Sequence, residues 1–268
     1  RQVQELKQMG VNAIRVTHNP AAQDLIDACN EQGILVVEEA FDTWIKPKNG
    51  NSNDYSVWFN QTVASDNEIL GATDGETWAQ FDLESMISRD YNAPSVIMWS
   101  LGNEVMEGIS GGTDAEYEAT ATKLINWAYD ADNTRPMTIG DNKLKADWQI
   151  SKTFANLLAA KGGTVGFNYA DGGVLDKYHS SNSNWFIYGS ETASAVNSRG
   201  IYYRTTGGSQ TSDKQLTSYD NSAVGWGATA SNAWYTVLTR DFAAGEYVWT
   251  GFDLSLIHIS EPTRRRGI

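Results

Sequence analysis

The sequence predicts an α/β fold built from parallel strands, and two observations support this prediction. Seven short apolar segments alternate with helical segments along 268 residues, which is the signature of repeated βαβ units. Polar side chains follow nearly every apolar segment, at the end where the active site of a (β/α)8 barrel lies. A doubly wound open sheet fits the alternation too, but no glycine-rich phosphate fingerprint follows any strand.

The first third of the chain predicts two strands, two helices and a long loop. One helix ends at Gly10, since glycine is favoured just after a helix, and the strand 13–16 follows. The next helix stops at Gly33, and the continuous apolar run 34–37 is typical of a strand covered on both faces. Residues 43–75 are polar and predict a loop. The buried stripe of the second helix, at helical spacing, is Ala22, Leu25, Ile26 and Cys29.

The rest of the chain continues the alternation. Thr113 and Glu116 form a capping box that opens a long helix. Apolar periodicity predicts, in order, a helix over 79–87, a strand over 96–101, a helix over 117–128, a strand over 137–140 and a helix over 150–158. It then predicts a strand over 164–168, a helix over 174–179, a strand over 185–189, a loop over 192–230, a helix over 234–242 and a strand over 247–250.

Composition excludes several classes of function. The chain carries 33 acidic and 20 basic residues, a formal charge of −13, and such a field repels phosphate backbones and anionic membranes. We therefore expect neither nucleic-acid binding nor membrane insertion. Cys29 is the single cysteine, so no disulfide forms within the chain, and the three histidines are widely spaced, so no metal cluster is expected.

The polar residues at the predicted strand ends are of types that can form hydrogen bonds to a sugar or transfer a proton. They are His18, Asn19, Glu38, Glu39, Asp42, Asn103, Glu104, Asp141, Asn142, Asn168, Tyr169, Glu191 and Asp253. Glu104 and Glu191 stand out because an apolar strand delivers each of them to the same mouth. Cleavage of a glycosidic bond needs one carboxylic acid to protonate the leaving oxygen and one carboxylate to attack the anomeric carbon. The alternative interpretation is structural, with both glutamates in ion pairs with Arg15 or Lys143.

Five segments carry a resemblance to a known family. They are NAIRVTHNP at 12–20, LVVEEAFD at 35–42, RDYNAPSVIMWSLGNE at 89–104, SETAS at 190–194 and VWTGFD at 248–253. In this order they resemble glycoside hydrolase family 2 and, within it, the β-galactosidases. The resemblance covers about residues 1–253, and the loop 199–226 is similar to that of large multi-domain β-galactosidases of Gram-positive bacteria.

The resemblance implies a retaining enzyme that removes terminal non-reducing β-D-galactose from galactosides or oligosaccharides. Glu104 would be the acid/base and Glu191 the nucleophile. Asn103 would hold the sugar 2-hydroxyl, Arg15 would orient Glu191, and Tyr169 would donate a hydrogen bond to it. Further substrate contacts are expected from His18, Asp42, Asp141, Asn168 and Trp249, the last of them as an apolar platform under the sugar.

Three acidic or aromatic positions have structural interpretations as well. Trp44 either contacts the sugar or packs within its loop. At least one of Glu38 and Glu39 is expected to form a structural pair with the arginine on the strand before them.

The chain also departs from the family pattern. Some β-galactosidases bind magnesium near the acid/base through a Glu and a His, but the corresponding stretch 41–44 has no histidine, so we expect no metal and no cofactor. The resemblance implies that the first barrel strand and upstream domains are missing. Seven strands would leave two open edges, so we expect the isolated chain to be poorly stable and to need those domains of its own polypeptide. Residues 1–253 are then the catalytic barrel, and residues 254–268 look like a non-native tail.

Two other functions compete with a β-galactosidase. A β-glucuronidase of the same family would need cationic groups for the substrate carboxylate, and the segment SETAS favours the galactosidase. A non-catalytic carbohydrate-binding barrel has no use for a proton donor paired with a nucleophile. By resemblance, a secreted or cell-surface bacterial protein is expected.

Overall fold

The computed structural model describes residues 1–63, 71–107, 112–205 and 215–252. The chain forms two compact units. The first contains residues 1–191 and 236–247, and the second contains residues 192–235 and the chain from 248 onward. Asp253 and the predicted tail 254–268 lie outside the described residues.

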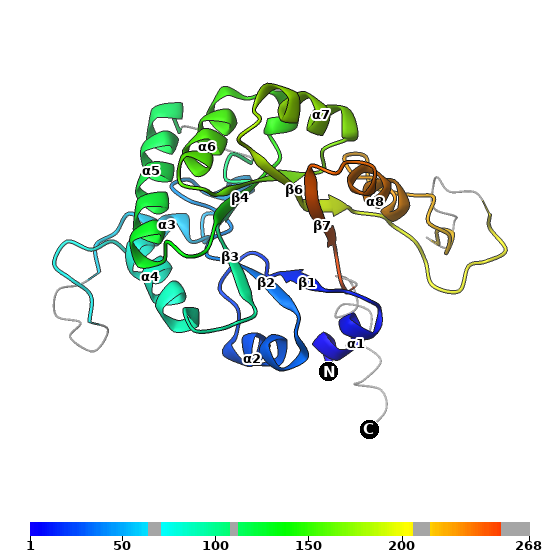
Figure 1. The fold of residues 1–268 in the computed structure, drawn as a ribbon, viewed down its shortest axis with the longest axis horizontal. Helices are drawn as coiled ribbons and strands as arrows, with labels where there is room; N and C mark the ends of the chain where they lie inside the picture. Colours follow the sequence, from blue (N-terminus) through cyan, green and yellow to red (C-terminus); the bar gives the residue numbers. More distant parts are fainter. Residues whose placement is uncertain (64–70, 108–111, 206–214, 253–268) are drawn as a thin grey trace. The chain divides into compact units, whose positions relative to one another are not determined.

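The first unit is built on one sheet of seven strands that follow one another in chain order (Figure 1). The strands are β1 (Ala13–Arg15), β2 (Leu35–Glu39), β3 (Val96–Asn103), β4 (Met137–Asp141), β5 (Thr164–Asn168), β6 (Phe186–Ala193) and β7 (Ala243–Trp249). The strands are parallel and form a nearly closed barrel, which confirms the predicted fold class. Parallel strands bring all their carboxyl ends to one mouth.

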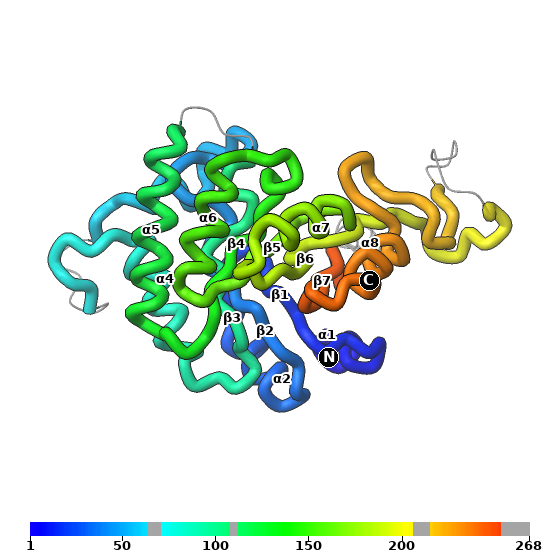
Figure 2. The backbone as a smooth tube through the Cα atoms, turned by 45° about the horizontal axis from the view of Figure 1, so that its top comes forward, coloured from blue at the N-terminus to red at the C-terminus, as the bar shows by residue number. Residues whose placement is uncertain are grey.

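Helices connect the strands and cover the outside of the sheet (Figures 1 and 2). They are α1 (Gln2–Gln8), α2 (Gln23–Gln32), α3 (Ser56–Phe59), α4 (Trp78–Asp90), α5 (Asp114–Ala131), α6 (Gln149–Ala160), α7 (Gly172–Ser181) and α8 (Ala230–Leu238), with short turns η1 (Lys48–Gly50) and η2 (Leu144–Ala146). Helix α5 packs between α4 and α6. Within the described residues, every helix falls short of a membrane-spanning segment in length or hydropathy.

Local signals in the sequence account for the helix ends. Gly33 adopts the left-handed conformation (φ +67°) that ends α2, as its position after the apolar stripe predicts. The capping box at the start of α5 is present, with the hydroxyl of Thr113 accepting from the backbone N–H of Glu116 and the Glu116 side chain reaching back. Gly33 thus ends α2 just before β2 begins at Leu35, and the capping box fixes the start of α5 after β3.

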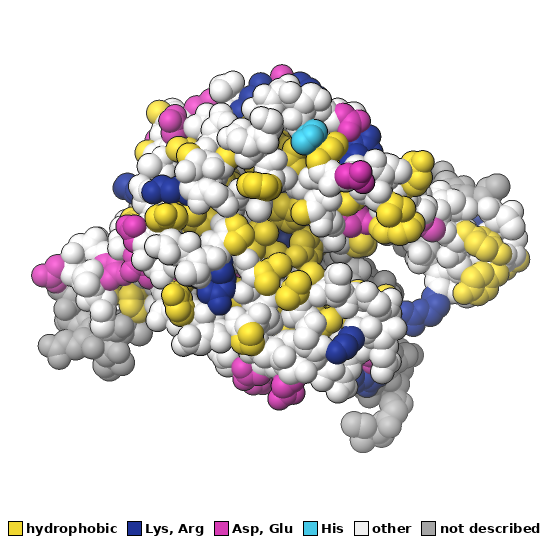
Figure 3. Space-filling model, in the orientation of Figure 1, with side chains coloured by type: hydrophobic (Ala, Val, Ile, Leu, Met, Phe, Trp, Pro, Cys, Tyr) yellow, Lys and Arg dark blue, Asp and Glu magenta, His cyan; other side chains and the backbone are white. Residues whose placement is uncertain are grey.

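The main hydrophobic core lies between the sheet and its helices. Trp99, Leu101, Leu83 and Leu124 are fully buried there. The indole N–H of Trp99 donates to Asp132 at 3.0 Å, so its polar atom is satisfied. Figure 3 shows hydrophobic side chains gathered at the centre of the face in view, with charged side chains around it. The buried layer holds the strand ends in place.

Several element boundaries differ from the predicted ones. Strand β6 continues through Glu191 and β3 through Asn103, so the polar residues sit inside the strands rather than after them. Helix α8 ends at Leu238, because Phe242 leaves the helix and its ring stacks on His179 at 3.9 Å. Strand β7 starts at Ala243, four residues before the predicted start, since small residues give a weak strand signal.

The second unit contains the predicted loop 192–230. Within its described part, an antiparallel bridge joins Ala195 to Ala223. The carboxylate of Asp220 accepts from the backbone N–H groups of Ala230 at 2.9 Å and Ser231 at 2.7 Å. Asp220 therefore caps the start of α8.

Glu38 on β2 and Asp90, the last residue of α4, form a pair of buried acidic side chains. Glu38 Oε1 on β2 accepts from Arg89 Nη2 at 2.8 Å and from the N–H of Ala21 at 3.2 Å, and Asp90 Oδ2 accepts from Arg89 Nε at 2.9 Å. Glu38 Oε2 and Asp90 Oδ1 are buried and have no donor among the described residues, so one proton held between them satisfies both. Burial, followed by the adjacent Asp90, raises the pKa of Glu38 to about 8, although Arg89 opposes the shift.

This acid pair predicts a pH-dependent stability. The folded-state pKa of Glu38 lies above the ordinary value of 4.5, so its stabilising contribution is complete below that pH and is lost as the pH rises toward 8. We expect the free energy of unfolding to fall by on the order of a few kcal/mol between about pH 5 and 8. Glu38→Gln, which keeps a donor toward Asp90, should flatten this slope in denaturant titrations. Glu118→Gln, exposed on α5, is the control and should keep the slope.

Candidate active site

The guanidinium of Arg15 lies at the centre of the mouth, at the end of β1. Its Nε and Nη2 donate to Glu39 Oε2 at 3.1 and 2.6 Å, and its Nη1 donates to Glu191 Oε2 at 3.0 Å. The remaining N–H groups bond the carbonyl of Ser190 at 3.0 Å and Asn103 Oδ1 at 2.9 Å. All five donors of the guanidinium are used. Burial alone would lower the pKa of Arg15, but the carboxylates of Glu39 and Glu191 outweigh it and raise the pKa.

Glu39 on β2 is the structural partner of this arginine. It is fully buried and also accepts from His18 Nδ1 at 2.7 Å and Ser100 Oγ at 2.7 Å. Burial raises the pKa of Glu39, but Arg15 and then His18 more than reverse that effect, so the pKa is lowered. The prediction that Glu38 or Glu39 pairs with the strand arginine is confirmed.

Glu191 lies in β6 with both carboxylate oxygens engaged. Oε2 contacts Arg15, and Oε1 accepts from the hydroxyl of Tyr169 at 2.6 Å. His18 Nε2 lies 3.9 Å from Oε2. Tyr169 has a left-handed backbone (φ +55°), and its N–H donates to the carbonyl of Glu191 at 2.8 Å. The strained residue is thus clamped to the glutamate that it contacts.

Glu104 follows β3 and has different surroundings. Its Oε1 accepts from Asn168 Nδ2 at 2.9 Å. Burial is the main cause of a raised pKa for Glu104. The bond from Asn168 opposes it, and the charge of Glu191 adds to it. The backbone of Glu104 is also left-handed (φ +45°), and its N–H donates to the carbonyl of Gly140 at 2.7 Å. The ammonium of Lys48 opposes the effect of burial and lowers the pKa of Glu104.

Two buried asparagines join these groups. Asn103 Oδ1 accepts from both Arg15 Nη2 and Asn168 Nδ2, at 2.9 and 3.0 Å. Asn168 Oδ1 accepts from Ser190 Oγ at 2.6 Å, so the amide of Asn168 is used within the protein. Asn168 is fully buried, so we assign it to the support of Glu104.

Gly140 on β4 lies under the point where these side chains meet. A β-carbon there would come within 2.7 Å of Arg15 Nη2, 3.0 Å of Asn103 Oδ1 and 3.2 Å of Asn168 Oδ1. Arg15 Nη2 donates to Asn103 Oδ1, and Asn168 Oδ1 accepts from Ser190 Oγ, so each of these atoms is held in place by a hydrogen bond. The network therefore requires glycine at this position.

The remaining predicted residues have varied surroundings. His18 is part-buried and bonded to Glu39, whose carboxylate is only an acceptor, so His18 Nδ1 carries the proton. Asp42 is paired with Lys48 at 2.7 Å. Asp141 Oδ1 accepts from the N–H groups of residues 143 and 144 at 2.6 and 2.7 Å, which fixes the turn after β4. Substrate contacts by these three side chains stay predictions.

The two tryptophan predictions have different outcomes. Trp44 is fully buried, and its indole N–H donates to the carbonyl of Leu101 at 2.8 Å. The packing interpretation of Trp44 is therefore confirmed, and its sugar-contact interpretation is wrong because no ring face is exposed. Trp249 lies in the second unit, so its role as a sugar platform stays a prediction.

Sequence reasoning did not identify Lys48, whose ammonium lies near the acidic residues. Lys48 lies in the loop 43–75, where nothing in the pattern distinguished it from its neighbours. Lys143 pairs with Glu107 at 2.6 Å, so it is not the structural partner of Glu104 that the alternative interpretation considered. The structure therefore supports that alternative only for Glu191 and Arg15, which form an ion pair.

The residues after β2 do not fit a divalent metal ion. Phe41 and Trp44 are buried and apolar, and Asp42 Oδ1 already bonds the ammonium of Lys48. Among the described residues, no three His, Cys, Asp or Glu side chains are grouped as metal ligands. Mg²⁺ requires oxygen ligands at about 2.0–2.1 Å in octahedral geometry. A lysine ammonium lies here instead.

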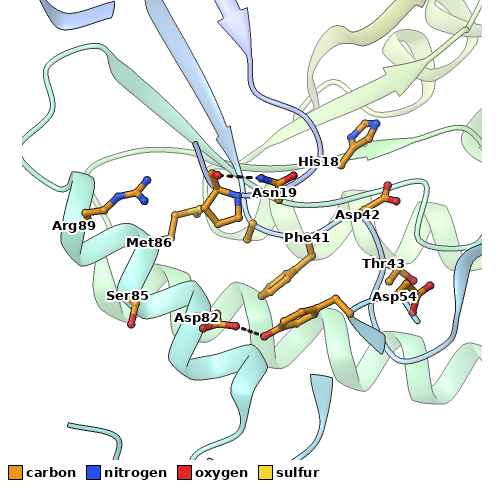
Figure 4. A pocket seen from close by; sticks show the side chains of 13 residues that line it. His18, Asn19, Phe41, Asp42, Thr43, Asp54, Asp82, Ser85, Met86 and Arg89 are labelled. Carbon is orange, nitrogen blue, oxygen red and sulfur yellow. Dashed lines mark hydrogen bonds between the residues drawn. The ribbon is translucent and has the colours of Figure 1, made fainter. Parts of the chain in front are cut away.

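A cavity of about 340 Å³ lies beside β2 (Figure 4). His18 and Asp42 line it, but the two glutamates at the mouth do not. The rings of Phe41 and Tyr55 stack on each other at 5.2 Å, and the hydroxyl of Tyr55 donates to Asp82. Since neither Glu104 nor Glu191 lines this cavity, we assign the chemistry to the mouth.

Two carboxylates at the mouth of a parallel α/β barrel, one bonded by an amide and one by a guanidinium, define the class of barrel glycosidases. The chain belongs to glycosyl hydrolases family 2, since residues 1–206 match the description "Glycosyl hydrolases family 2, TIM barrel domain".

Relatives and solved structures agree with this assignment. A β-galactosidase of Bacteroides ovatus, BoGH2A, is 32% identical over 98% of this chain and 32% of its own length. A β-glucuronidase of Bacteroides fragilis is 26% identical over 97% of this chain and 33% of its own length. A family 2 structure from Bacteroides cellulosilyticus has a TM-score of 0.65 at 26% identity, covering 93% of this chain and 24% of that one. The chain thus spans about a third of the length of these two curated relatives.

The arginine cluster predicts a large loss of stability on mutation. Arg15→Met removes the cation from two buried carboxylates, and breaking such a pair costs about 3–5 kcal/mol. We expect the free energy of unfolding in urea to fall by that amount. Arg1→Met, which removes an exposed arginine–glutamate pair with Glu5, is the matched control and should leave stability unchanged. Equal effects of the two substitutions would contradict the prediction.

Proposed function

We propose that this chain is the catalytic barrel of a retaining β-galactosidase, with Glu104 as acid/base and Glu191 as nucleophile. The single observation that supports it is the contrast between the two glutamates. Burial raises the pKa of Glu104, which favours the protonated form, while Glu191 contacts a guanidinium and a phenol, as a carboxylate does. Titratable pairs in opposed environments are the pattern of acid and nucleophile.

The reaction would proceed in two displacements. Glu191 attacks the anomeric carbon as Glu104 gives its proton to the glycosidic oxygen, the bond to that oxygen breaks, and the sugar becomes an ester of Glu191. Glu104, now a carboxylate, takes a proton from water, which attacks the same carbon and releases Glu191. Arg15 and Tyr169 hold the nucleophile, and Asn103 is the candidate for the sugar 2-hydroxyl.

Retaining chemistry sets the spacing of the two glutamates. We expect their carboxyl groups to lie about 5 Å apart, as in retaining enzymes, rather than about 6.5–9.5 Å with room for a water. A crystal structure of the complete polypeptide with a trapped glycosyl–enzyme ester on Glu191 measures this spacing. An inverted anomer in the product, followed by NMR, would contradict the mechanism.

The acid/base role predicts a substrate-dependent loss. In the complete polypeptide, Glu104→Ala should lower kcat/KM for lactose by about 10²–10⁴-fold, the contribution of general acid catalysis. An aryl galactoside with a good leaving group needs no proton, so its cleavage to the glycosyl ester should be affected much less. Equal losses on both substrates would remove the assignment.

The nucleophile predicts a loss that no leaving group can rescue. Glu191→Gln should abolish turnover of lactose and of aryl galactosides alike, because an amide does not form the ester. Glu118→Gln, on the exposed face of α5, is the control with normal turnover. A fully active Glu191→Gln protein would instead point to a different nucleophile, whereas a wild type that binds galactosides without turning them over would support a non-catalytic sugar-binding barrel.

The choice of sugar rests on the segment SETAS around Glu191 and on the similarity to BoGH2A. The similarity to a β-glucuronidase supports the second candidate, a uronide-cleaving enzyme. Chromogenic galactoside and glucuronide, compared by kcat/KM with the complete polypeptide, distinguish the two. We expect the galactoside to be preferred, and a preference for the glucuronide would reverse the assignment.

A further inference from the structure

The ammonium of Lys48 is fixed beside the acid/base by its own loop. The backbone N–H of Lys48 donates to Asp54 Oδ2 at 2.6 Å, and the side chain is only 14% exposed. Its Nζ donates to Asp42 Oδ1 at 2.7 Å and to the carbonyl of Asn103 at 3.1 Å. The loop thus delivers one cation to the peptide that precedes Glu104.

The peptide bond between Asn103 and Glu104 joins the last residue of β3 to the proposed acid/base. Its carbonyl, from Asn103, is bonded to Lys48, and its N–H, from Glu104, is bonded to the carbonyl of Gly140. Rotation of the peptide would swing Asn103 and Glu104 together. Because Glu104 has a left-handed backbone, its conformation depends on surrounding contacts that hold it.

The charges around Glu104 come from several elements. Glu191 on β6 and Glu107 after β3 raise its pKa, and the amide of Asn168 on β5 lowers it. Lys48 is a cation that lowers it, and Lys145, in the turn after β4, also interacts with Glu104 electrostatically. Lys48 differs from Lys145 because it also bonds the backbone next to Glu104.

We propose that Lys48 is a positioning residue that supplies a fixed cation beside the acid/base. Its ammonium holds the 103–104 peptide and Asp42. It lies next to the residues after β2, which do not fit a divalent metal ion. This inference rests on the proposed function, since it concerns the proton transfer assigned to Glu104. A structural role alone would change stability but not the pH dependence of catalysis.

The test is a pH profile of kcat/KM for lactose with the complete polypeptide. Lys48→Met removes the cation that favours the Glu104 carboxylate, so the basic limb should move up by about half to one pH unit. Misplacement of the acid should lower kcat by about 10–100-fold. Lys48→Arg should keep the wild-type limb, as should Lys46→Met, which changes a nearby lysine outside this contact network.

A chemical rescue covers the case in which Lys48→Met folds poorly. Lys48→Cys can be alkylated with 2-bromoethylamine, which restores an ammonium at this position, while Cys29 is fully buried and protected. Rescue of the basic limb by alkylation would support the proposal. EDTA and added Mg²⁺ should leave the wild-type profile unchanged.

The outcomes separate this inference from the proposed function. A wild-type protein without activity on galactosides or glucuronides would overturn the proposed function itself. An active wild type whose Lys48→Met profile overlaps its own, or whose activity requires Mg²⁺, would overturn only the role of Lys48.

Discussion

The guanidinium of Arg15 is the interaction on which the rest of the mouth depends. Its five N–H groups reach acceptors on β2, β3 and β6 from the end of β1, so one side chain ties together strands that are far apart in sequence. Removing one partner of a buried ion pair is costly because it leaves a charge uncompensated. The same contacts that hold the barrel end together therefore also orient Glu191.

The two candidate catalytic glutamates differ because their strands supply different partners. Glu191 faces a cation and a phenol, whereas Glu104 faces an amide and a partly buried environment that raises its pKa. Both environments come from side chains that are buried or part-buried and hydrogen-bonded, so their geometry is set before a substrate arrives. Such preorganisation costs no rearrangement during the reaction.

Much of this arrangement could be predicted from the sequence. Apolar segments followed by polar residues were enough to place Glu104 and Glu191 at one mouth, because parallel strands align their ends. The role of Lys48 could not be predicted, since a lysine in a polar loop gives no periodic signal and its contacts depend on tertiary folding. The acid pair Glu38–Asp90 was missed for the same reason, since its partner comes from a helix about fifty residues away. The start of β7 was missed because alanine and glycine carry little strand preference.

The requirement for glycine at position 140 has a consequence for sequence surveys of the family. A β-carbon there comes within 3.2 Å of three polar atoms that hydrogen bonds hold in place, so a larger residue at this position would force the Arg15–Asn103–Asn168 arrangement to shift. A glycine on the fourth strand of the described sheet thus acts as a marker for this wiring, and its replacement identifies relatives whose mouths are built differently. Relatives can therefore be grouped by whether they carry glycine at this position.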